Sequence, residues 1–225
     1  SERRRTPKNC SYCGGAWCAD SISDTNGSST NAERTQFMNG LENIQILSGM
    51  PRGVGHAFAK AEVVFTQAQV AAAIDRLAVA MTVSLQDQNP ICLSVMQGGL
   101  YLSGQLMQRM VFPLQQGYVD VSRYREATQG GDLRWQGAEH PPLADRTVVL
   151  IDDVLDEGHT MAYLQQWAVQ AGAKKVFIAV LADKNKSSVS ADYSALACPD
   201  RFLFGCGMDI HGYGRNLSTL YAVPN

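Results

Sequence analysis

Apolar residues recur along most of the chain in two patterns, which predict helices and strands in turn. The predicted helices carry apolar residues three and four positions apart, and they lie at residues 70–85, 100–110 and 160–171. The predicted strands are short apolar or alternating runs, and they lie at residues 91–96, 118–124, 147–154, 174–181, 201–206 and 220–223. Strands that alternate with helices favour an α/β fold with a parallel sheet.

Cap and turn residues set the boundaries of these elements. Thr66 and Gln69 have the spacing of a capping box at the start of the first helix, and an Asn-Pro pair follows its end. Residues 126–142 are polar and include two adjacent glycines, so they predict a long loop. In a parallel sheet, ligands bind beyond the carboxyl ends of the strands. The candidate ligand-binding segments are therefore residues 97–99 and 152–160.

Residues 1–49 differ from the rest because they are rich in Ser, Asn, Thr and Arg and keep neither period. They include the run CSYCGGAWC, whose cysteines are Cys10, Cys13 and Cys18. A zinc knuckle needs four ligands, and three thiols without a nearby His favour a disordered or adventitious extension instead. We therefore expect a domain at residues 50–225, with Met50 as a candidate original start.

Composition narrows the class of protein. The chain has 225 residues, 45% hydrophobic and 18% charged, which suffices for one sizeable domain with an appendage. Its net charge of -2 gives no general attraction to nucleic acid or to an anionic membrane. No run of 18 apolar residues predicts a membrane span, and the basic N-terminus lacks the apolar stretch of a secretory signal. Of six cysteines, Cys92, Cys198 and Cys206 are joined by no regular framework, which favours a reduced, cytoplasmic setting.

The segment VVLIDDVLDEGHTM at residues 148–161 combines acids with a turn that suits an anion. Asp152 and Asp153 fall at the carboxyl end of a buried strand. Gly158 and Thr160 follow, just before a helix whose free N–H groups and dipole attract a phosphate. Carboxylates bind sugar hydroxyls and magnesium. A ribose 5-phosphate with Mg²⁺ would therefore suit both the acids and the anion-binding turn. The alternative is a strand that ends in solvated acids before an ordinary capped helix.

Residues 149–160 (VLIDDVLDEGHT) resemble the phosphoribosyl pyrophosphate (PRPP) motif of type I phosphoribosyltransferases, most closely of their hypoxanthine-guanine branch. The order of the motifs extends this resemblance over residues 90–223. It implies a type I phosphoribosyltransferase fold. In that α/β fold a mostly parallel twisted sheet is flanked by helices, with a small hood and a mobile lid loop.

The resemblance also implies a role for each residue of the motif. Asp152 and Asp153 would contact the ribose hydroxyls and the metal. Asp156 would be the catalytic residue, which accepts the proton near purine N7. The 5-phosphate would lie in a loop made of Glu157, Gly158, His159 and Thr160. The family usually has Thr or Ser where Glu157 stands, so the main chain of this loop would carry more of the phosphate binding.

A second segment, Gln97 with Gly98 and Gly99, resembles the pyrophosphate loop of the family. Family members often hold a cis peptide here, which in this chain would join Met96 to Gln97. The family often has Lys where Gln97 stands, so we expect main-chain donors to bind the diphosphate. Taken alone, the segment would equally well be a plain turn between a strand and a helix.

A third segment resembles the mobile lid of the family, which excludes water from a reactive sugar. It includes Ser122, Arg123 and Tyr124 and continues through residues 128–132. The alternative is a solvated hairpin loop, because polar loops that contain glycine are common.

The purine would be bound by residues from two further segments. Lys184 would donate to the 6-oxo group, so it would select hypoxanthine and guanine over adenine. Lys186 is a second choice for this role, and a surface lysine is the alternative for Lys184. Phe202 would stack on the purine, and the main chain of Leu203 would read its edge. Without the resemblance, Phe202 would be a core residue of a strand.

Two residues near the C-terminus would complete the metal and pyrophosphate sites. Asp209 would hold a second magnesium ion, largely through water. Arg215 would bind the pyrophosphate, although alone it would be any surface arginine.

The resemblance therefore implies transfer of 5-phosphoribosyl from PRPP to N9 of a 6-oxopurine base, giving IMP or GMP and pyrophosphate, with Mg²⁺ as cofactor. Neither nucleic acid nor a membrane is an expected partner, and family members are commonly homodimers or homotetramers. Three alternatives are a xanthine-guanine sibling enzyme, a non-catalytic PRPP-sensing regulator that binds nucleic acid, and a phosphoacceptor domain. The balanced charge argues against the regulator, and the Gly-His-Thr turn after the acids argues against the phosphoacceptor.

Overall fold

The computed structural model describes residues 51–123 and 133–224. The expectations for residues 1–49, for Met50 and for Tyr124 with the loop after it lie outside the described residues. In chain order the elements are α2 (Arg52–Ala59), β1 (Glu62–Phe65), α3 (Gln67–Leu85), β2 (Ile91–Met96), α4 (Leu100–Met107), β3 (Gln115–Arg123), β4 (Leu133–Glu139), β5 (Thr147–Leu155), α5 (His159–Gln170), β6 (Lys175–Asp183), β7 (Tyr193–Ala197), β8 (Leu203–Phe204) and β9 (Leu220–Ala222).

The large sheet has six strands in the order β4-β3-β2-β5-β6-β7. Strands β3, β2, β5, β6 and β7 pair in parallel, while β4 runs antiparallel to β3 at one edge. The predicted, mostly parallel α/β sheet is therefore confirmed. Because the five parallel strands point the same way, their carboxyl ends lie along one edge, where ligands bind in such sheets.

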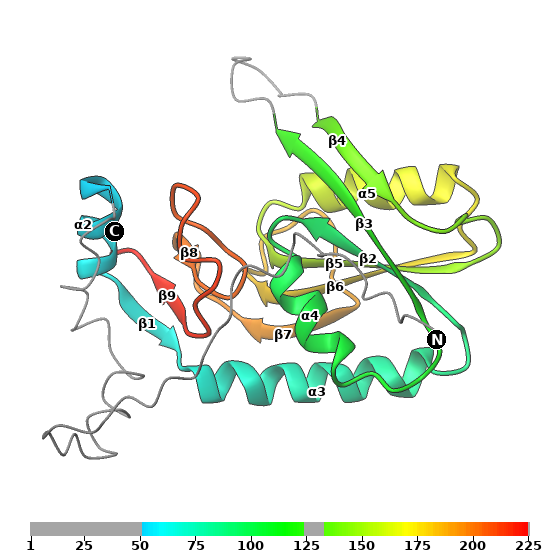
Figure 1. Ribbon diagram of the computed structural model, residues 1–225, viewed down its shortest axis with the longest axis horizontal. Helices are drawn as coiled ribbons and strands as arrows, with labels where there is room; N and C mark the ends of the chain where they lie inside the picture. The colour runs from blue at the N-terminus through cyan, green and yellow to red at the C-terminus, as the bar shows by residue number, and fades with distance from the viewer. Residues whose placement is uncertain (1–50, 124–132, 225) are drawn as a thin grey trace, which may run out of the picture. The chain divides into compact units, whose positions relative to one another are not determined.

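Helices cover both faces of the large sheet (Figure 1). Buried residues of α3 and α4 share a core with Val149 and Ile151 of β5, whereas those of α5 share another with Val148 and Leu150. Successive residues of β5 are thus buried on opposite faces, as a central parallel strand requires. The acidic residues that follow extend this same strand, so the core fixes their direction.

Helix α3 begins where the capping box predicts. The main-chain N–H of Thr66 donates to Gln69 Oε1 over 2.9 Å, and the Thr66 hydroxyl accepts from the main-chain N–H of Gln69. By length and composition α3 could cross a membrane, which is weak evidence because a core helix passes the same test. Its buried side packs into the core, and the residues on that side are Val70, Ala73, Ile74, Leu77, Ala78, Met81 and Leu85.

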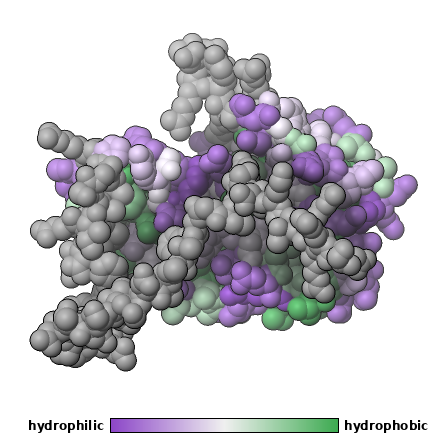
Figure 2. Space-filling model, in the orientation of Figure 1, coloured by the Kyte–Doolittle hydropathy of each residue, from purple (hydrophilic) through white to green (hydrophobic). Residues whose placement is uncertain are grey.

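A small second sheet, in the order β1-β9-β8, forms the hood together with α2 (Figure 1). Phe204 of β8 is fully buried, and its ring centroid lies 4.7 Å from Phe58 of α2 and 5.2 Å from Tyr221 of β9. The hood that the resemblance implies is therefore confirmed. On the face shown in Figure 2, hydrophilic side chains gather where the hood meets the large sheet.

The long loop predicted at residues 126–142 is wrong for its second half, because Leu133–Glu139 form β4. Trp135 points inward from this strand: its ring centroid lies 4.9 Å from that of Trp167, and its Nε1 donates to the Tyr163 hydroxyl over 2.9 Å. The strand lies at an edge of the sheet, and its seven residues, LRWQGAE, mix polar with apolar side chains. Long-range packing of one aromatic side chain, rather than a local apolar run, specifies it.

Other boundaries differ by a few residues. The helix predicted at 100–110 ends at Met107, and the strand predicted at 201–206 is shortened to Leu203–Phe204. The patterns also missed α2, β1 and β7, which have only eight, four and five residues. Elements this short do not show a clear period.

Candidate active site

The acidic motif spans the end of β5 and the start of α5. Because β5 runs to Leu155, Asp152 and Asp153 lie within its last residues and not beyond them. Gly158 has a φ of 83°, in the left-handed region that favours glycine, and α5 begins at His159. This turn leaves the first N–H groups of α5 without helical partners. The segment therefore has the geometry of an anion-binding turn.

The loop after β6 supports this turn. The main-chain N–H of Ser188 donates to the carbonyl oxygen of Glu157 over 3.3 Å. Ser187 Oγ lies so close to Gly158 that a side chain there would collide with it. His159 Nε2 lies 3.4 Å from Glu157 Oε2, and both side chains are exposed. The loop after β6 therefore packs directly against the turn that precedes α5.

Asp152 and Asp153 form a close acidic pair. Asp153 is 8% exposed, and its main-chain N–H donates to Asp152 Oδ1 over 2.9 Å. Loss of hydration raises the pKa of Asp153 to about 6, although the nearby Arg215 opposes this shift. Loss of hydration and the charge of Asp153 raise the pKa of Asp152 well above its ordinary value. A cation next to this pair would favour the charged form of both groups.

Gly98 and Gly99 pass directly against β5. A Cβ on Gly98 would collide with the carboxylate of Asp153, and one on Gly99 would collide with the main-chain oxygen of Ile151. The peptide between Met96 and Gln97 is cis, as the resemblance implies, and the side chain of Gln97 is exposed. The close approach therefore requires both glycines, and it brings the predicted pyrophosphate loop beside the acidic pair.

Arg215 links two of the acids predicted to hold metal. Its Nη2 lies 2.5 Å from Asp209 Oδ1, and its Nη1 lies 3.9 Å from Asp153 Oδ2. Its Nη1 also donates to the carbonyl oxygen of Gly207 over 2.6 Å. Arg215 is therefore fixed at the carboxyl edge of the sheet and is not an arbitrary surface arginine.

Asp156 lies between two lysines from the loop after β6. Lys184 Nζ is 2.8 Å from Asp156 Oδ2, and Lys186 Nζ is 2.7 Å from Asp156 Oδ1. Burial would raise the pKa of Asp156, but hydrogen bonds and charges from both lysines outweigh it and lower this pKa below its ordinary value. The side chain of Lys184 is 8% exposed, so its interpretation as a surface lysine is wrong.

Phe202 and Phe204 have opposite environments although they are two residues apart. Phe204 is fully buried, whereas Phe202 is 56% exposed. The interpretation as core residues therefore holds for Phe204 alone, and the ring of Phe202 is open to a stacking partner. The side chain of Leu203 is buried, so its main chain is the part that remains to contact a ligand.

The predicted lid is described only at its start. Ser122 and Arg123 are the last two residues of β3, and Tyr124 lies outside the described residues. The role of this segment stays a prediction.

The acids suit a hydrated magnesium ion better than a closed metal cage. Within residues 51–123 and 133–224, no three His, Cys, Asp or Glu side chains converge closely enough to enclose a metal. Mg²⁺ usually keeps several waters and is held by one or two carboxylates together with substrate phosphates. Asp152 and Asp153 offer adjacent oxygen donors. Asp209 lies near them, because Arg215 contacts both Asp209 and Asp153. This donor set fits a magnesium ion that arrives with a diphosphate.

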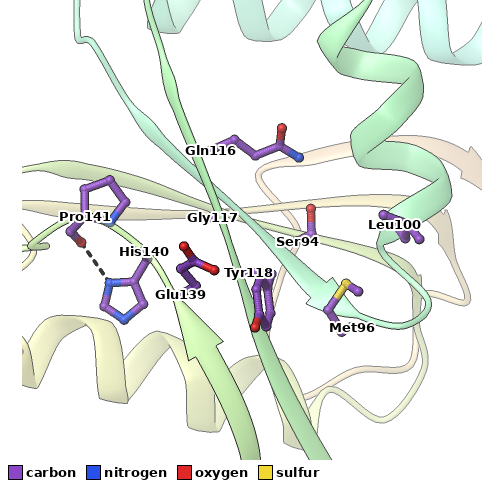
Figure 3. Close-up of a pocket in the computed structure, with 9 residues that line it drawn as sticks. All are labelled: Ser94, Met96, Leu100, Gln116, Gly117, Tyr118, Glu139, His140 and Pro141. Atoms are coloured by element: carbon purple, nitrogen blue, oxygen red, sulfur yellow. Dashed lines mark hydrogen bonds between the residues drawn. The ribbon is translucent and has the colours of Figure 1, made fainter. Parts of the chain in front are cut away.

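A pocket of about 600 Å³, whose lining includes no residue of the acidic motif, lies on the α4 side of β2 and β3 (Figure 3). Its lining residues are Ser94, Met96, Leu100, Gln116, Gly117, Tyr118, Glu139, His140 and Pro141. Leu100 is 56% exposed and Tyr118 is 38% exposed. This face of the sheet is therefore partly apolar and open.

The fold and the site together define a class of protein, and a family comparison agrees. The sequence model of the phosphoribosyl transferase domain matches residues 61–211, about two thirds of the chain. The chain therefore belongs to the phosphoribosyl transferase domain family.

Individual members of the family are similar to this chain over most of their length. The chain is 27% identical over 160 residues to the hypoxanthine-guanine phosphoribosyltransferase of Bacillus subtilis (strain 168), covering 69% of this chain and 89% of that protein. It is 25% identical over 162 residues to the hypoxanthine-guanine-xanthine phosphoribosyltransferase of Tritrichomonas foetus, covering 70% and 88%. A solved hypoxanthine phosphoribosyltransferase from Staphylococcus aureus superimposes with a TM-score of 0.68 at 22% identity, covering 72% and 91%. That last likeness supports the fold.

Two features of the site escaped the sequence analysis. Lys186 pairs with Asp156, although it was considered only as a second choice for the purine, and Asp200 lies 2.5 Å from Lys186. The register of the sheet explains the first contact, because Leu155 of β5 pairs with Asp183 of β6. The residues that follow these two strands are therefore neighbours. A sequence without its strand order carries no signal of that neighbourhood.

Proposed function

We propose that the chain transfers the 5-phosphoribosyl group of PRPP to N9 of hypoxanthine or guanine, giving IMP or GMP and pyrophosphate. The observation that carries this proposal is the pair of Asp156 with Lys184, which stands two residues before the anion-binding turn of Gly158 and offers a carboxylate and an ammonium to the N7 and 6-oxo groups of a purine. The named activities of the relatives agree with the proposal.

The sugar and its phosphates would occupy the carboxyl edge of the large sheet. The main-chain N–H groups after Gly158 would bind the 5-phosphate, and Asp152 and Asp153 would accept hydrogen bonds from the ribose hydroxyls. When bound, Mg²⁺ supplies positive charge that stabilises the leaving diphosphate. Asp152, Asp153 and Asp209 would hold it, largely through water. Arg215 and the main chain of Gly98 and Gly99 would add donors toward the same diphosphate.

The purine would lie between Phe202 and the two charged groups Asp156 and Lys184. Asp156 is held in its charged form and can accept the proton at N7 as N9 becomes bonded to the sugar. Lys184 would donate to the 6-oxo group. A 6-amino group would place a donor against this ammonium, so adenine is disfavoured.

A wider base range is the second candidate, because the relative from Tritrichomonas foetus carries xanthine in its name. Lys184 would donate equally well to any 6-oxopurine, since xanthine has the same oxygen at C6. The base panel described below separates this candidate from the first.

We also propose a homodimer or homotetramer in a cytoplasmic setting, with residues 50–225 as the transferase domain. The open face around Figure 3's pocket, with Leu100 and Tyr118 exposed, offers apolar surface for a second copy. Cys92, Cys198 and Cys206 are free thiols in buried positions, which suits a reducing compartment. Sedimentation at increasing protein concentration tests the assembly, and a purely monomeric chain would contradict it.

The test of the activity is incubation with PRPP, Mg²⁺ and a panel of free bases, with the nucleotide products separated by chromatography. We expect IMP and GMP from hypoxanthine and guanine, and no AMP from adenine. The panel includes xanthine and uracil, and the chain carrying Asp156→Asn is the matched control. Formation of no nucleotide from any base would refute the proposal.

A further inference from the structure

Lys186 belongs to the purine end of the site, yet the function proposed above gives it no role. Its ammonium lies 2.7 Å from Asp156 Oδ1 and 2.5 Å from Asp200 Oδ1, and its side chain is 35% exposed. Lys184 lies 2.8 Å from Asp156 Oδ2. Each carboxylate oxygen of Asp156 thus has a lysine of its own.

The two oxygens of Asp156 have different surroundings. Oδ1 is closed off from solvent, and within the part of the chain that the structure describes, Lys186 is the group that reaches it, through a 2.7 Å ion pair rather than a well-aligned hydrogen bond. The side chain as a whole is 44% exposed, so its open part is the side of Oδ2. A purine N–H that approaches from solvent therefore meets Oδ2, which Lys184 already contacts.

Lys184 would consequently make two contacts during the proposed reaction. It contacts Asp156 Oδ2, and it would also donate to the 6-oxo group of the base. An ammonium has three N–H donors, so Lys184 can contact both groups, but its position then depends on the base as well as on the carboxylate. Lys186 would not contact the base, because Asp156 Oδ1, the oxygen that it pairs with, is shielded from the open side of the site.

We propose that Lys186 is a positioning residue that holds Asp156 Oδ1 in place, so that Oδ2 stays directed at purine N7 while Lys184 engages the 6-oxo group. This inference rests on the proposed function. An ordinary aspartate is already charged at neutral pH, so a second lysine is not needed to ionise it. The second ion pair instead restricts the orientation of the carboxylate, and catalysis is sensitive to the placement of such groups.

The contact between Lys186 and Asp156 is set by the main chain. The loop that carries Lys186 continues into Ser188, whose N–H and Oγ both reach the carbonyl oxygen of Glu157, over 3.3 and 3.4 Å. Ser187 packs against Gly158. The loop with the lysine is therefore attached to the loop with the aspartate, which keeps the base of the Lys186 side chain near Asp156.

The other charged groups near Asp156 have partners that leave this arrangement intact. Asp200 faces both lysines from the segment before β8, at 3.8 Å from Lys184 and 2.5 Å from Lys186. Asp183, at the end of β6, accepts from the main-chain N–H of Asn185 over 2.8 Å. On the loop of Asp156 itself, Glu157 and His159 approach each other. Removal of the Lys186 ammonium therefore leaves Asp156 Oδ1 facing no other cation among the described residues.

The test compares Lys186→Met with wild type, with Lys174→Met as the matched control, because Lys174 is an exposed lysine before the start of β6. Kinetics are measured from about pH 5 to pH 9 with hypoxanthine and PRPP varied separately. We expect kcat to fall about tenfold in Lys186→Met, with the KM for PRPP within about twofold of wild type. The acid side of its pH profile should move to higher pH. Lys186→Arg should restore both values, and Lys174→Met should behave as wild type.

An unchanged kcat together with an unchanged pH profile in Lys186→Met would overturn the inference, as would a loss confined to the KM for PRPP. Failure of the proposed function is recognised separately, because wild type would then make no nucleotide from any base. In that case a ¹³C NMR titration of the Asp156 carboxylate, assigned with Asp156→Asn, gives the answer without substrates. A higher midpoint in Lys186→Met would support the positioning contact, and equal midpoints would refute it.

Discussion

The sugar-phosphate half of the site and the purine half are built in different ways. In the first, the main chain makes the site: Gly158 turns into α5, and Gly98 lies against β5. In the second, side chains from separate loops meet, with Asp156 between Lys184 and Lys186. Close main-chain packing is therefore the distinctive feature of the first half, and ion pairs between separate loops are that of the second. Substitutions in the first half should affect folding and PRPP binding, whereas those in the second should affect turnover and base affinity.

The largest effect is expected for Asp156→Asn, which keeps the shape of the side chain but removes its charge. The amide cannot accept the N7 proton, so kcat should fall about a hundredfold or more. The KM for PRPP should change little, because the sugar-phosphate half is built separately. Steady-state kinetics with both substrates varied measure this difference. Equal losses in turnover and in PRPP binding would show that the two halves are not separate.

A comparably large effect, on stability, is expected for Gly99→Ala. The new Cβ would collide with main-chain oxygens of Ile151 and Val95, which cannot turn away. The free energy of unfolding should fall by about 3 kcal/mol. Gly104→Ala is the matched control, because a Cβ there meets no atom within 4 Å and Gly104 lies exposed in α4. Chemical denaturation compares the two, and equal stability of both variants would show that close packing does not fix this half.

Gly98→Ala sharpens the same point, because its Cβ would collide with a side chain, the carboxylate of Asp153. That carboxylate can rotate, so the loss of stability should be smaller than for Gly99→Ala. The KM for PRPP should rise instead, since Asp153 would leave its position. If the KM for PRPP stays at the wild-type value, Asp153 does not contact the substrate.

The acidic pair should make stability depend on pH. The pKa of Asp153 is raised to about 6 from an ordinary value of 3.8, so the folded protein binds more protons between these values. Stability should therefore fall as the pH rises from about 4 to about 6, by on the order of 3 kcal/mol. Asp153→Asn should show a smaller fall, because Asp152 keeps the part of its own raised pKa that comes from lost hydration. Unfolding in magnesium-free buffer at several pH values measures it, and parallel curves for both proteins would contradict the explanation.

The smallest effect is expected for Phe202→Ala. Its ring is exposed, so removing it should cost little stability but should raise the KM for hypoxanthine about tenfold through lost stacking. Phe204→Ala is the contrasting control, because this buried ring should cost about 3–5 kcal/mol of folding free energy. An unchanged purine KM in Phe202→Ala would remove its stacking role.

Local sequence patterns predicted most of the large sheet and the sugar-phosphate half, because these depend on short segments. The strand at residues 91–96 and the turn around Gly158 are encoded by neighbouring residues, and both were found where expected. Strand β4 was missed because Trp135 packs on α5, far away in sequence. The pairing of Lys186 with Asp156 was missed because it follows from strand order. Contacts between distant segments thus account for what the sequence analysis failed to predict.

The most direct test of the central claim is the position of the phosphorus atom of IMP when a crystal of the chain with this nucleotide is solved. We expect its phosphate to accept hydrogen bonds from the main-chain N–H groups of residues 158–161, with the purine ring on Phe202. A phosphate bound away from this turn, or a purine away from Phe202, would contradict it.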